Sequence, residues 1–191
     1  MNIPLEIIDL SKTYDSKEAV RSISFKVNEN EIIGILGPNG CGKTTTIGMI
    51  LGLLKPTKGK VLINGIEVEK QRVELLNELN FISPYIELPK KLTVKQNLEV
   101  YGRLYDVKDL GTKIDYLCEK LRLNEFINKI TGELSSGQKN RVSLAKSIIN
   151  DPSVLLLDEP TASLDPETGD FVRSFLEEYQ KEKKTSILLA S

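Results

Sequence analysis

The sequence lacks histidine and tryptophan, and it contains only two cysteines, Cys41 and Cys118. The absence of imidazole excludes histidine metal sites and every catalytic triad that uses histidine as its base. Two cysteines are too few for a disulfide framework, and these two are not spaced like the ligands of a metal site. The cysteine content therefore predicts a chain that resides in a reduced, cytoplasmic setting.

Long apolar segments and an excess of charge of one sign are absent as well. No stretch approaches the roughly 18 apolar residues that a membrane span requires, and residues 1–10 alternate apolar and charged side chains, unlike a signal peptide. The 26 basic and 27 acidic residues nearly cancel, leaving a net charge of −1. We therefore expect no nucleic acid as the main partner, and any work at a membrane would depend on a separate partner.

The 191 residues are expected to form one α/β domain. Alternating or apolar runs predict strands at 5–10, 22–27, 31–36, 81–82, 154–157 and 186–189, with a short hairpin at 60–64 and 66–68. The run at 31–36 is nearly continuous, which predicts a strand buried on both faces. Helical patterns occur at 44–54, 93–123, 138–149 and 166–181. Because no strong strand signal separates residue 82 from residue 154, we expect a helical subdomain at about 90–145, inserted between the halves of the core.

Residues 37–44 match the pattern GxxxxGK[ST] of a phosphate-binding loop. Its glycines let backbone N–H groups turn toward phosphate oxygens, and the positive end of the following helix points to the same place. Lys43 is expected to reach the β- and γ-phosphates, and the Thr44 hydroxyl to bind Mg²⁺. The flanking strand and helix argue against a chance match, and Cys41 is interpreted as a small space-filling residue rather than a redox sensor. The predicted nucleotide-binding residues of this segment are Gly37, Pro38, Asn39, Gly40, Cys41, Gly42, Lys43, Thr44 and Thr45.

The apolar segment at 154–157 runs directly into two carboxylates, Asp158 and Glu159. A buried strand that ends in this way places both charges at the carboxyl edge of a parallel sheet, where ligands bind in open α/β folds. We expect Asp158 to hold Mg²⁺, directly or through water, and Glu159 to orient or deprotonate the attacking water. Many strands end in an acidic residue, so this interpretation depends on the phosphate-binding loop in the same chain.

Two further segments give the sequence a family resemblance. Residues 134–138 read Leu-Ser-Ser-Gly-Gln and precede Asp158, while residues 162–165 read Ala-Ser-Leu-Asp and follow Glu159-Pro160. With the phosphate-binding loop and the acidic strand end, they resemble the Walker A, signature, Walker B and D-loop motifs of the ABC ATPase domain, in that order and over essentially the whole chain. The resemblance implies a P-loop NTPase core with a mostly parallel sheet, an N-terminal antiparallel β subdomain and an inserted helical signature subdomain.

The resemblance also implies a head-to-tail dimer, of like or unlike ATPase subunits, that encloses two ATP molecules. The signature of one subunit would contact the γ-phosphate held by the other, since a hydroxyl and a bare N–H at a helix N-terminus suit an anion. A simple N-cap is the alternative, and the two roles are compatible. Asp165 would couple the two sites, or cap the helix that starts at Pro166. The signature residues in this sequence are Ser135, Ser136, Gly137 and Gln138.

Three other side chains are assigned by position. Tyr14 stands where the family has an aromatic ring that stacks on adenine, and an ordinary strand-end tyrosine is the alternative. Arg141 and Lys146, on the helix after the signature, are interpreted as solvated or ion-paired surface residues and not as catalytic groups.

The sequence departs from the family at two places. Pro84 stands where the family usually has the Q-loop glutamine, and proline has no side-chain amide to bind Mg²⁺ or position water. Ser83 and Glu87 are candidate substitutes, and both turnover and coupling to a membrane partner are affected. The family's switch histidine would follow Ser191, so we expect a truncated chain or fragment that binds ATP and hydrolyses it slowly.

The sequence therefore predicts a Mg²⁺-dependent ABC ATPase, peripheral on the cytoplasmic face of a membrane through a separate permease subunit. ATP would close the dimer and hydrolysis would reopen it, and residues 51–60 resemble the exporter-type branch. One alternative is a soluble ABC ATPase that acts on ribosomes or DNA. Such relatives typically carry tandem ATPase domains or long coiled-coil insertions, which this sequence does not show. The other alternative, a nucleotide-binding regulatory module with little turnover, is supported only by Pro84.

Overall fold

The structure is a computed structural model that describes residues 3–75, 77–83, 87–161 and 164–191. Its strands form an antiparallel sheet and a parallel sheet. The antiparallel sheet has the order β2-β1-β4-β5 and comprises β1 (Leu5–Tyr14), β2 (Lys17–Val27), β4 (Lys58–Ile63) and β5 (Ile66–Glu67). The parallel sheet has the order β3-β8-β7-β6 and comprises β3 (Ile32–Ile35), β6 (Leu79–Ile82), β7 (Val154–Asp158) and β8 (Ser186–Ala190).

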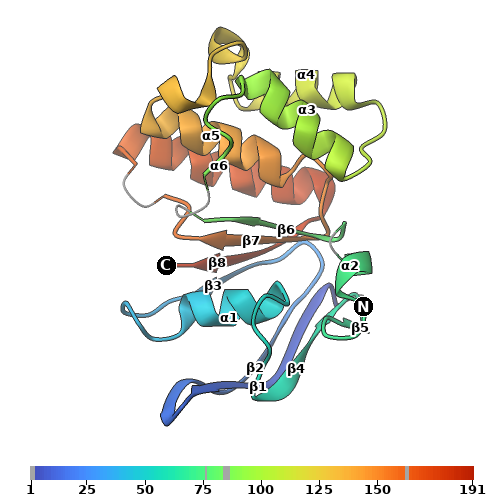
Figure 1. Cartoon of the computed structure of the whole chain (residues 1–191), viewed down its shortest axis with the longest axis vertical. Coiled ribbons are helices and arrows are strands. Elements are labelled where there is room, and N and C mark those ends of the chain that lie inside the picture. Colours follow the sequence, from blue (N-terminus) through green and yellow to red (C-terminus); the bar gives the residue numbers. More distant parts are fainter. Residues whose placement is uncertain (1–2, 76, 84–86, 162–163) are drawn as a thin grey trace.

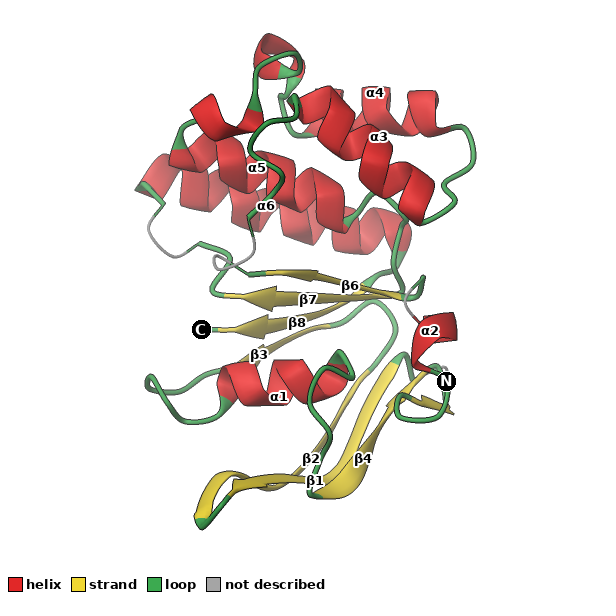
Figure 2. Cartoon of the chain, in the orientation of Figure 1, coloured by secondary structure: helices red, strands yellow, loops and turns green. Residues whose placement is uncertain are grey.

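The parallel sheet lies in the middle of the molecule, with a layer on each side (Figures 1 and 2). On one side are α1 and the antiparallel sheet, and on the other is a layer of helices that includes α3, α4, α5 and α6. The helices are α1 (Lys43–Ile50), α2 (Arg72–Leu75), α3 (Val94–Leu104), α4 (Leu110–Lys120), α5 (Ser136–Ser147) and α6 (Pro166–Lys183), with 3₁₀ turns η1 (Asn124–Phe126) and η2 (Thr131–Glu133). The prediction of an α/β fold with an antiparallel sheet, a parallel core sheet and an inserted helical segment is confirmed.

The central strand β7 shows why the two layers meet on this sheet. Its side chains alternate between two apolar cores, with Leu155 and Leu157 packing among the helices and Val154 and Leu156 packing toward α1. All of β7 is buried, as expected for a parallel strand covered on both faces. The strand therefore delivers Asp158 to the carboxyl edge of the sheet in a fixed position.

The first two strands are longer than their alternation predicts. β1 and β2 pair along most of their length, but the register shifts between Ile7 and Leu10, Leu10 and Lys12, and Lys12 and Thr13. Each shift exchanges the faces on which successive side chains lie, so the period of two is lost along much of both strands, and the alternation indicated strands only at 5–10 and 22–27.

Helix α1 is shorter than predicted because a glycine ends it. The pattern suggested 44–54, whereas the helix ends at Ile50 and Gly52 adopts a φ of +64°. Leu53 and Leu54 both direct their N–H groups back to the Gly48 carbonyl, which closes the helix in a left-handed turn that glycine adopts without penalty.

The prediction that residues 31–36 are buried on both faces is wrong. Ile33 and Ile35 pack on the α1 side, but Ile32 is 36% exposed and Leu36 80% exposed. Within the described part of the chain, β3 pairs only with β8 and the helical core contains none of its residues. Its apolar run therefore belongs to an edge strand with one covered face.

The interpretation of Arg141 and Lys146 as solvated or ion-paired residues also needs correction. Arg141 places its guanidinium 4.7 Å from the centre of the Phe171 ring, and its Nε is buried. Lys146 lies over Tyr101, with Nζ 5.2 Å from the ring centre, and donates a hydrogen bond to Asn80. Burial lowers the pKa of Lys146. Both side chains therefore join α5 to neighbouring elements through aromatic and amide contacts.

Candidate functional site

The loop between β3 and α1 has the backbone shape that its glycines predict. Gly40 and Gly42 have φ values of +81° and +99°. At Gly42 a side chain is also sterically excluded, because a Cβ there would lie 2.4 Å from the Ala19 carbonyl oxygen. Gly42 is followed directly by the first turn of α1, so the free N–H groups of that turn face the loop. The Cys41 sulfur lies beside Gly37, and Cys41 is exposed.

Thr44 and Asp158 form a contact between the loop and the parallel sheet. The Thr44 hydroxyl donates a 3.2 Å hydrogen bond to Asp158 Oδ2. Lys43, which is 8% exposed, directs its ammonium to the carbonyls of Gly37 and Pro38. The loop and the acidic strand end, predicted separately from sequence, are therefore joined in space.

The two carboxylates have different surroundings. Asp158 is 2% exposed, and burial raises its pKa, helped by the charge of Glu159 and opposed by the Thr44 hydrogen bond and the Lys43 charge. Glu159 is half-buried, has a φ of +50°, and donates its N–H to the Ala190 carbonyl on β8 at 2.8 Å. Asp158 is therefore held at the sheet edge, whereas Glu159 turns out of the strand.

These groups line one cavity of about 390 Å³. Its floor is the phosphate-binding loop, and its wall is the carboxyl end of β7. The lining residues are Ala19, Asn39, Gly40, Gly42, Lys43, Thr44, Thr45, Asp158 and Glu159. With the exception of Ala19, each of them is a site residue expected from sequence, which makes this cavity the candidate nucleotide site.

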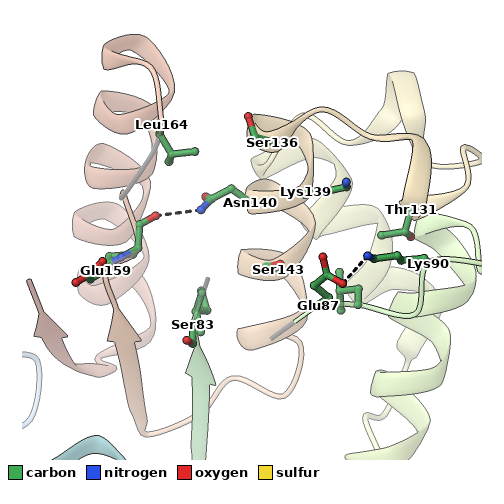
Figure 3. Close-up of a pocket in the computed structure, with 13 residues that line it drawn as sticks. Ser83, Glu87, Lys90, Thr131, Ser136, Lys139, Asn140, Ser143, Glu159 and Leu164 are labelled. Atoms are coloured by element: carbon green, nitrogen blue, oxygen red, sulfur yellow. Dashed lines mark hydrogen bonds and ion pairs between the residues drawn. The ribbon is translucent and has the colours of Figure 1, made fainter. Parts of the chain in front are cut away.

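A second cavity, of about 230 Å³, adjoins Glu159 on the side of the helical layer. Figure 3 shows that α5 forms one wall, with Ser136, Asn140 and Ser143 on the same helix, and that Glu159 lies across from it. Asn140 spans the gap and donates a 3.0 Å hydrogen bond to the Pro160 carbonyl. Glu159 is therefore shared between the two cavities.

The donor set of the first cavity fits Mg²⁺ and a phosphate chain. A hydroxyl and a carboxylate are hard oxygen ligands, as Mg²⁺ prefers, and the ion is commonly completed by water and phosphate oxygens. Among the described residues no cluster of three or more histidine, cysteine or acidic side chains could hold a metal. Thr44 and Asp158 therefore suit an ion that arrives with a polyphosphate rather than one held in a protein cage.

Comparison with known proteins identifies the family. The sequence model of the family described as "ABC transporter" matches residues 20–162. The chain belongs to the ABC transporter family. The match begins within β2 and ends after the acidic strand end, so it includes the phosphate-binding loop and the signature segment.

Named members of the ABC transporter family resemble the chain over nearly all its length. It is 32% identical to the ABC transporter ATP-binding protein NatA of Bacillus subtilis, over 98% of this chain and 78% of that protein. It is 37% identical to the Nod factor export ATP-binding protein I of Rhizobium etli, over 96% of this chain and 59% of that protein. A solved dimeric ATP-binding cassette in a post-hydrolysis state, bound to ADP and Pi, superimposes with a TM-score of 0.86 at 26% identity, over 98% of this chain and 87% of that one.

The ABC signature segment forms the start of α5. Ser135 caps the helix by accepting a hydrogen bond from the Gln138 N–H at 3.2 Å, and the Gln138 side chain accepts one from the Ser135 N–H at 3.1 Å. This reciprocal capping box realises the N-cap interpretation. Ser135 and Ser136 are exposed, Gly137 is half-buried, and none of these residues lines the phosphate-loop cavity of its own chain.

Two other predicted residues also lie apart from the phosphate-loop cavity. Asp165 caps α6, accepting hydrogen bonds from the Thr168 N–H at 2.9 Å and the Thr168 hydroxyl at 2.7 Å. These bonds lower the pKa of Asp165. Tyr14 is 44% exposed at the end of β1, with Lys12 Nζ 5.1 Å from its ring centre. The structure therefore shows the cap at Asp165 and an available ring at Tyr14.

Some predicted site residues lie outside the described part of the chain, and the sequence analysis did not predict two residues that the structure places at the cavities. Pro84 at the Q-loop position and residues 162–163 of the D-loop lie outside the described residues. Sequence reasoning missed Ala19, which lies on β2 and lines the cavity. It also missed Asn140, whose polar side chain one turn after Ser136 was a usable signal. Across the described residues, none of the helices is both long and apolar enough to cross a membrane.

Proposed function

We propose that this chain binds ATP with Mg²⁺ and hydrolyses it, and that hydrolysis drives transport through a separate membrane subunit. The observation that carries the proposal is the Thr44–Asp158 contact, in a cavity that also contains Lys43 and Glu159. Phosphoryl transfer requires mainly positioning and charge neutralisation. This cavity offers N–H donors, an ammonium, oxygen ligands and a second carboxylate, that of Glu159.

The mechanism assigns a role to each group. Backbone N–H groups of the loop and of the first turn of α1 bind phosphate oxygens. Lys43, now directed to the Gly37 and Pro38 carbonyls, neutralises charge on the β- and γ-phosphates. Thr44 and Asp158 would hold Mg²⁺, which neutralises phosphate charge when bound. Glu159 takes a proton from water as the water oxygen bonds to the γ-phosphorus, and the bond to the bridging oxygen breaks to release ADP and phosphate.

We further propose that two ATPase subunits act together, as a homodimer or a heterodimer with ATP between them. The exposed Ser135 and Ser136 do not line the cavity of their own chain, so they are available to the nucleotide of a second chain. The α5 N-terminus offers N–H donors suited to an anion. A similar solved cassette bound to ADP and Pi is dimeric. In the dimer, Asp165 would couple the two sites and Tyr14 would stack on adenine.

The membrane part of the proposal assigns the chain to the cytoplasmic face of a membrane, held there by a permease. Its support is family membership, together with relatives that include a Nod factor export ATP-binding protein. The exporter-type assignment rests on the resemblance of residues 51–60 and on the name of the Nod factor export relative.

Affinity purification from detergent-solubilised native membranes, followed by mass spectrometry, tests the membrane assignment. A stoichiometric partner with several membrane spans would support it. Ribosomal proteins or DNA-repair factors, without any membrane protein, would refute it in favour of a soluble ABC ATPase. The Lys43→Ala variant serves as a control, since a resident permease is expected to bind it as well.

A further inference from the structure

The backbone at Glu159 has an unusual conformation. Its φ of +50° lies in the left-handed region, which residues with a Cβ avoid. Pro160 follows it, and a residue before proline is more restricted than others. Such a conformation persists only where its surroundings hold it in place. The carboxylate that would act on water therefore depends on nearby contacts for its direction.

Two hydrogen bonds hold this segment, one on each side. From the sheet, the Ala190 carbonyl on β8 accepts the Glu159 N–H at 2.8 Å. From the helical layer, the Asn140 amide donates to the Pro160 carbonyl at 3.0 Å. Pro160 is buried, and proline has no N–H of its own to contribute. From the helical layer, Asn140 therefore fixes the Pro160–Thr161 peptide, which directly follows the Glu159–Pro160 bond.

Asn140 also belongs to the helix that carries the signature. It lies one turn after Ser136 on α5, and Figure 3 shows its side chain crossing the cavity toward the loop after Glu159. The body of α5 is anchored elsewhere, through Val142, Leu144 and Ala145 in the helical core. The Asn140 hydrogen bond is thus not needed to form the helix, but it connects the helix to the loop after Glu159.

We propose that Asn140 is a positioning residue that holds Glu159 in its left-handed conformation and couples the placement of Glu159 to the placement of α5 in the same chain. A displacement of the α5 N-terminus would then change the direction of the Glu159 carboxylate. The inference rests on the proposed function, in which Glu159 acts on water.

Asn140→Asp tests the proposal in the full-length protein, with steady-state ATPase kinetics and fluorescent-nucleotide binding as readouts. Aspartate has the same shape but cannot donate a hydrogen bond when ionised. We expect kcat to fall at least about 10-fold while nucleotide affinity and KM stay within about twofold, since Asn140 does not line the phosphate-loop cavity. Asn140→Gln keeps a donor and is expected to retain more activity. Ser143→Ala, on the same helix and cavity wall, is the matched control and is expected to retain wild-type kcat.

A double variant separates positioning from a general structural role. In the Glu159→Gln background, Asn140→Asp is expected to cause no further loss of turnover, because both changes act through the same carboxylate. A wild-type kcat for Asn140→Asp, or equal losses in the aspartate and glutamine variants, would overturn the inference while leaving the proposed function intact. Wild-type turnover in Glu159→Gln alone would instead overturn the proposed function. If Asn140→Asp fails to fold, Asn140→Ala provides the same comparison.

Discussion

The Thr44 hydroxyl donates a 3.2 Å hydrogen bond to the Asp158 carboxylate, although 114 positions separate the two residues in the chain. Thr44 belongs to the first turn of α1, and Asp158 is the last residue of β7. This contact sets the spacing between the loop that would bind phosphate and the carboxylates that would act on it.

Lys43→Ala is expected to weaken ATP binding strongly. The ammonium is a charge-assisted donor, and such bonds contribute about 1.5–3 kcal/mol, which corresponds to roughly 10- to 150-fold in affinity. Titration with a fluorescent ATP analogue measures the loss. Lys55→Ala is the control, because that side chain is 83% exposed and pairs with Glu69 on the surface. Unchanged affinity in Lys43→Ala would refute the assignment of the phosphate-binding loop.

Glu159→Gln is expected to retain ATP binding but to lose turnover by about 10²- to 10⁴-fold, the usual contribution of a general base. Because glutamine cannot accept the proton, the ATP-bound dimer should accumulate. Size-exclusion chromatography with light scattering, with ATP and with ADP, detects this dimer. A monomer under both conditions would contradict the proposed ATP-driven association, and preserved turnover would contradict the role of Glu159.

Asp158→Asn is expected to raise the melting temperature at pH 7 by a few degrees in the absence of nucleotide. Burial raises the pKa of Asp158, so ionisation of this group opposes folding at neutral pH. The cost disappears as the pH falls and the carboxylate is protonated in both the folded and unfolded states. The two melting temperatures should therefore converge in acid. An equal or lower melting temperature for the variant at pH 7 would show that another contact of Asp158 outweighs its burial.

The same substitution is expected to weaken stabilisation by Mg²⁺-ATP, because an amide is a poorer ligand than a carboxylate for a hard cation. Thermal shifts measured with ATP alone and with Mg²⁺-ATP separate this effect from the change in intrinsic stability. An equal Mg²⁺-dependent shift in both proteins would argue against Asp158 as a ligand.

The variants Gly42→Ala and Gly40→Ala separate two effects in the phosphate-binding loop, backbone strain and steric clash. Both glycines have positive φ, so alanine strains the backbone at each, by roughly 1–2 kcal/mol. Only at Gly42 would the new Cβ also meet the Ala19 carbonyl, at 2.4 Å, whereas at Gly40 no atom lies within 4 Å. We expect the larger loss of nucleotide affinity and stability at Gly42, measured by titration and thermal melting. Equal losses at both positions would imply that strain alone governs the loop.

Local patterns were sufficient to predict the phosphate-binding loop and the acidic strand end. Lys43 and Thr44 follow glycines in a fixed spacing, and Asp158 ends an apolar run, so both signals lie within a few residues. The fold class followed from the same motifs and from the resemblance they carry. Exposure at β3 could not be predicted, because Ile32 and Leu36 look like core residues until the position of β3 at the sheet edge is known.

The sequence analysis also did not predict contacts between residues that lie far apart in the chain. Ala19 lies on β2, and its carbonyl oxygen lies close to Gly42 of the phosphate-binding loop. No short sequence pattern records this contact between separate elements. Arg141 and Lys146 read as surface charges, but aromatic rings on α6 and α3 cover them. Asn140 could have been noticed as a polar residue on the helix after the signature, but its partner at Pro160 lies 20 positions away.

The order of the parallel sheet has a consequence for how the protein is made. β8 lies between β3 and β7 in the sheet, yet it follows both in the chain. Ile32 on β3, for example, is the register partner of Ile187 on β8. A ribosome therefore releases the middle strand of this sheet after its neighbours. The hydrogen bond that the Gly37 N–H of the phosphate-binding loop donates to the Ser191 carbonyl cannot form until then. We expect the nascent chain to expose the unpaired edges of β3 and β7 during synthesis, when chaperones have the greatest opportunity to bind it.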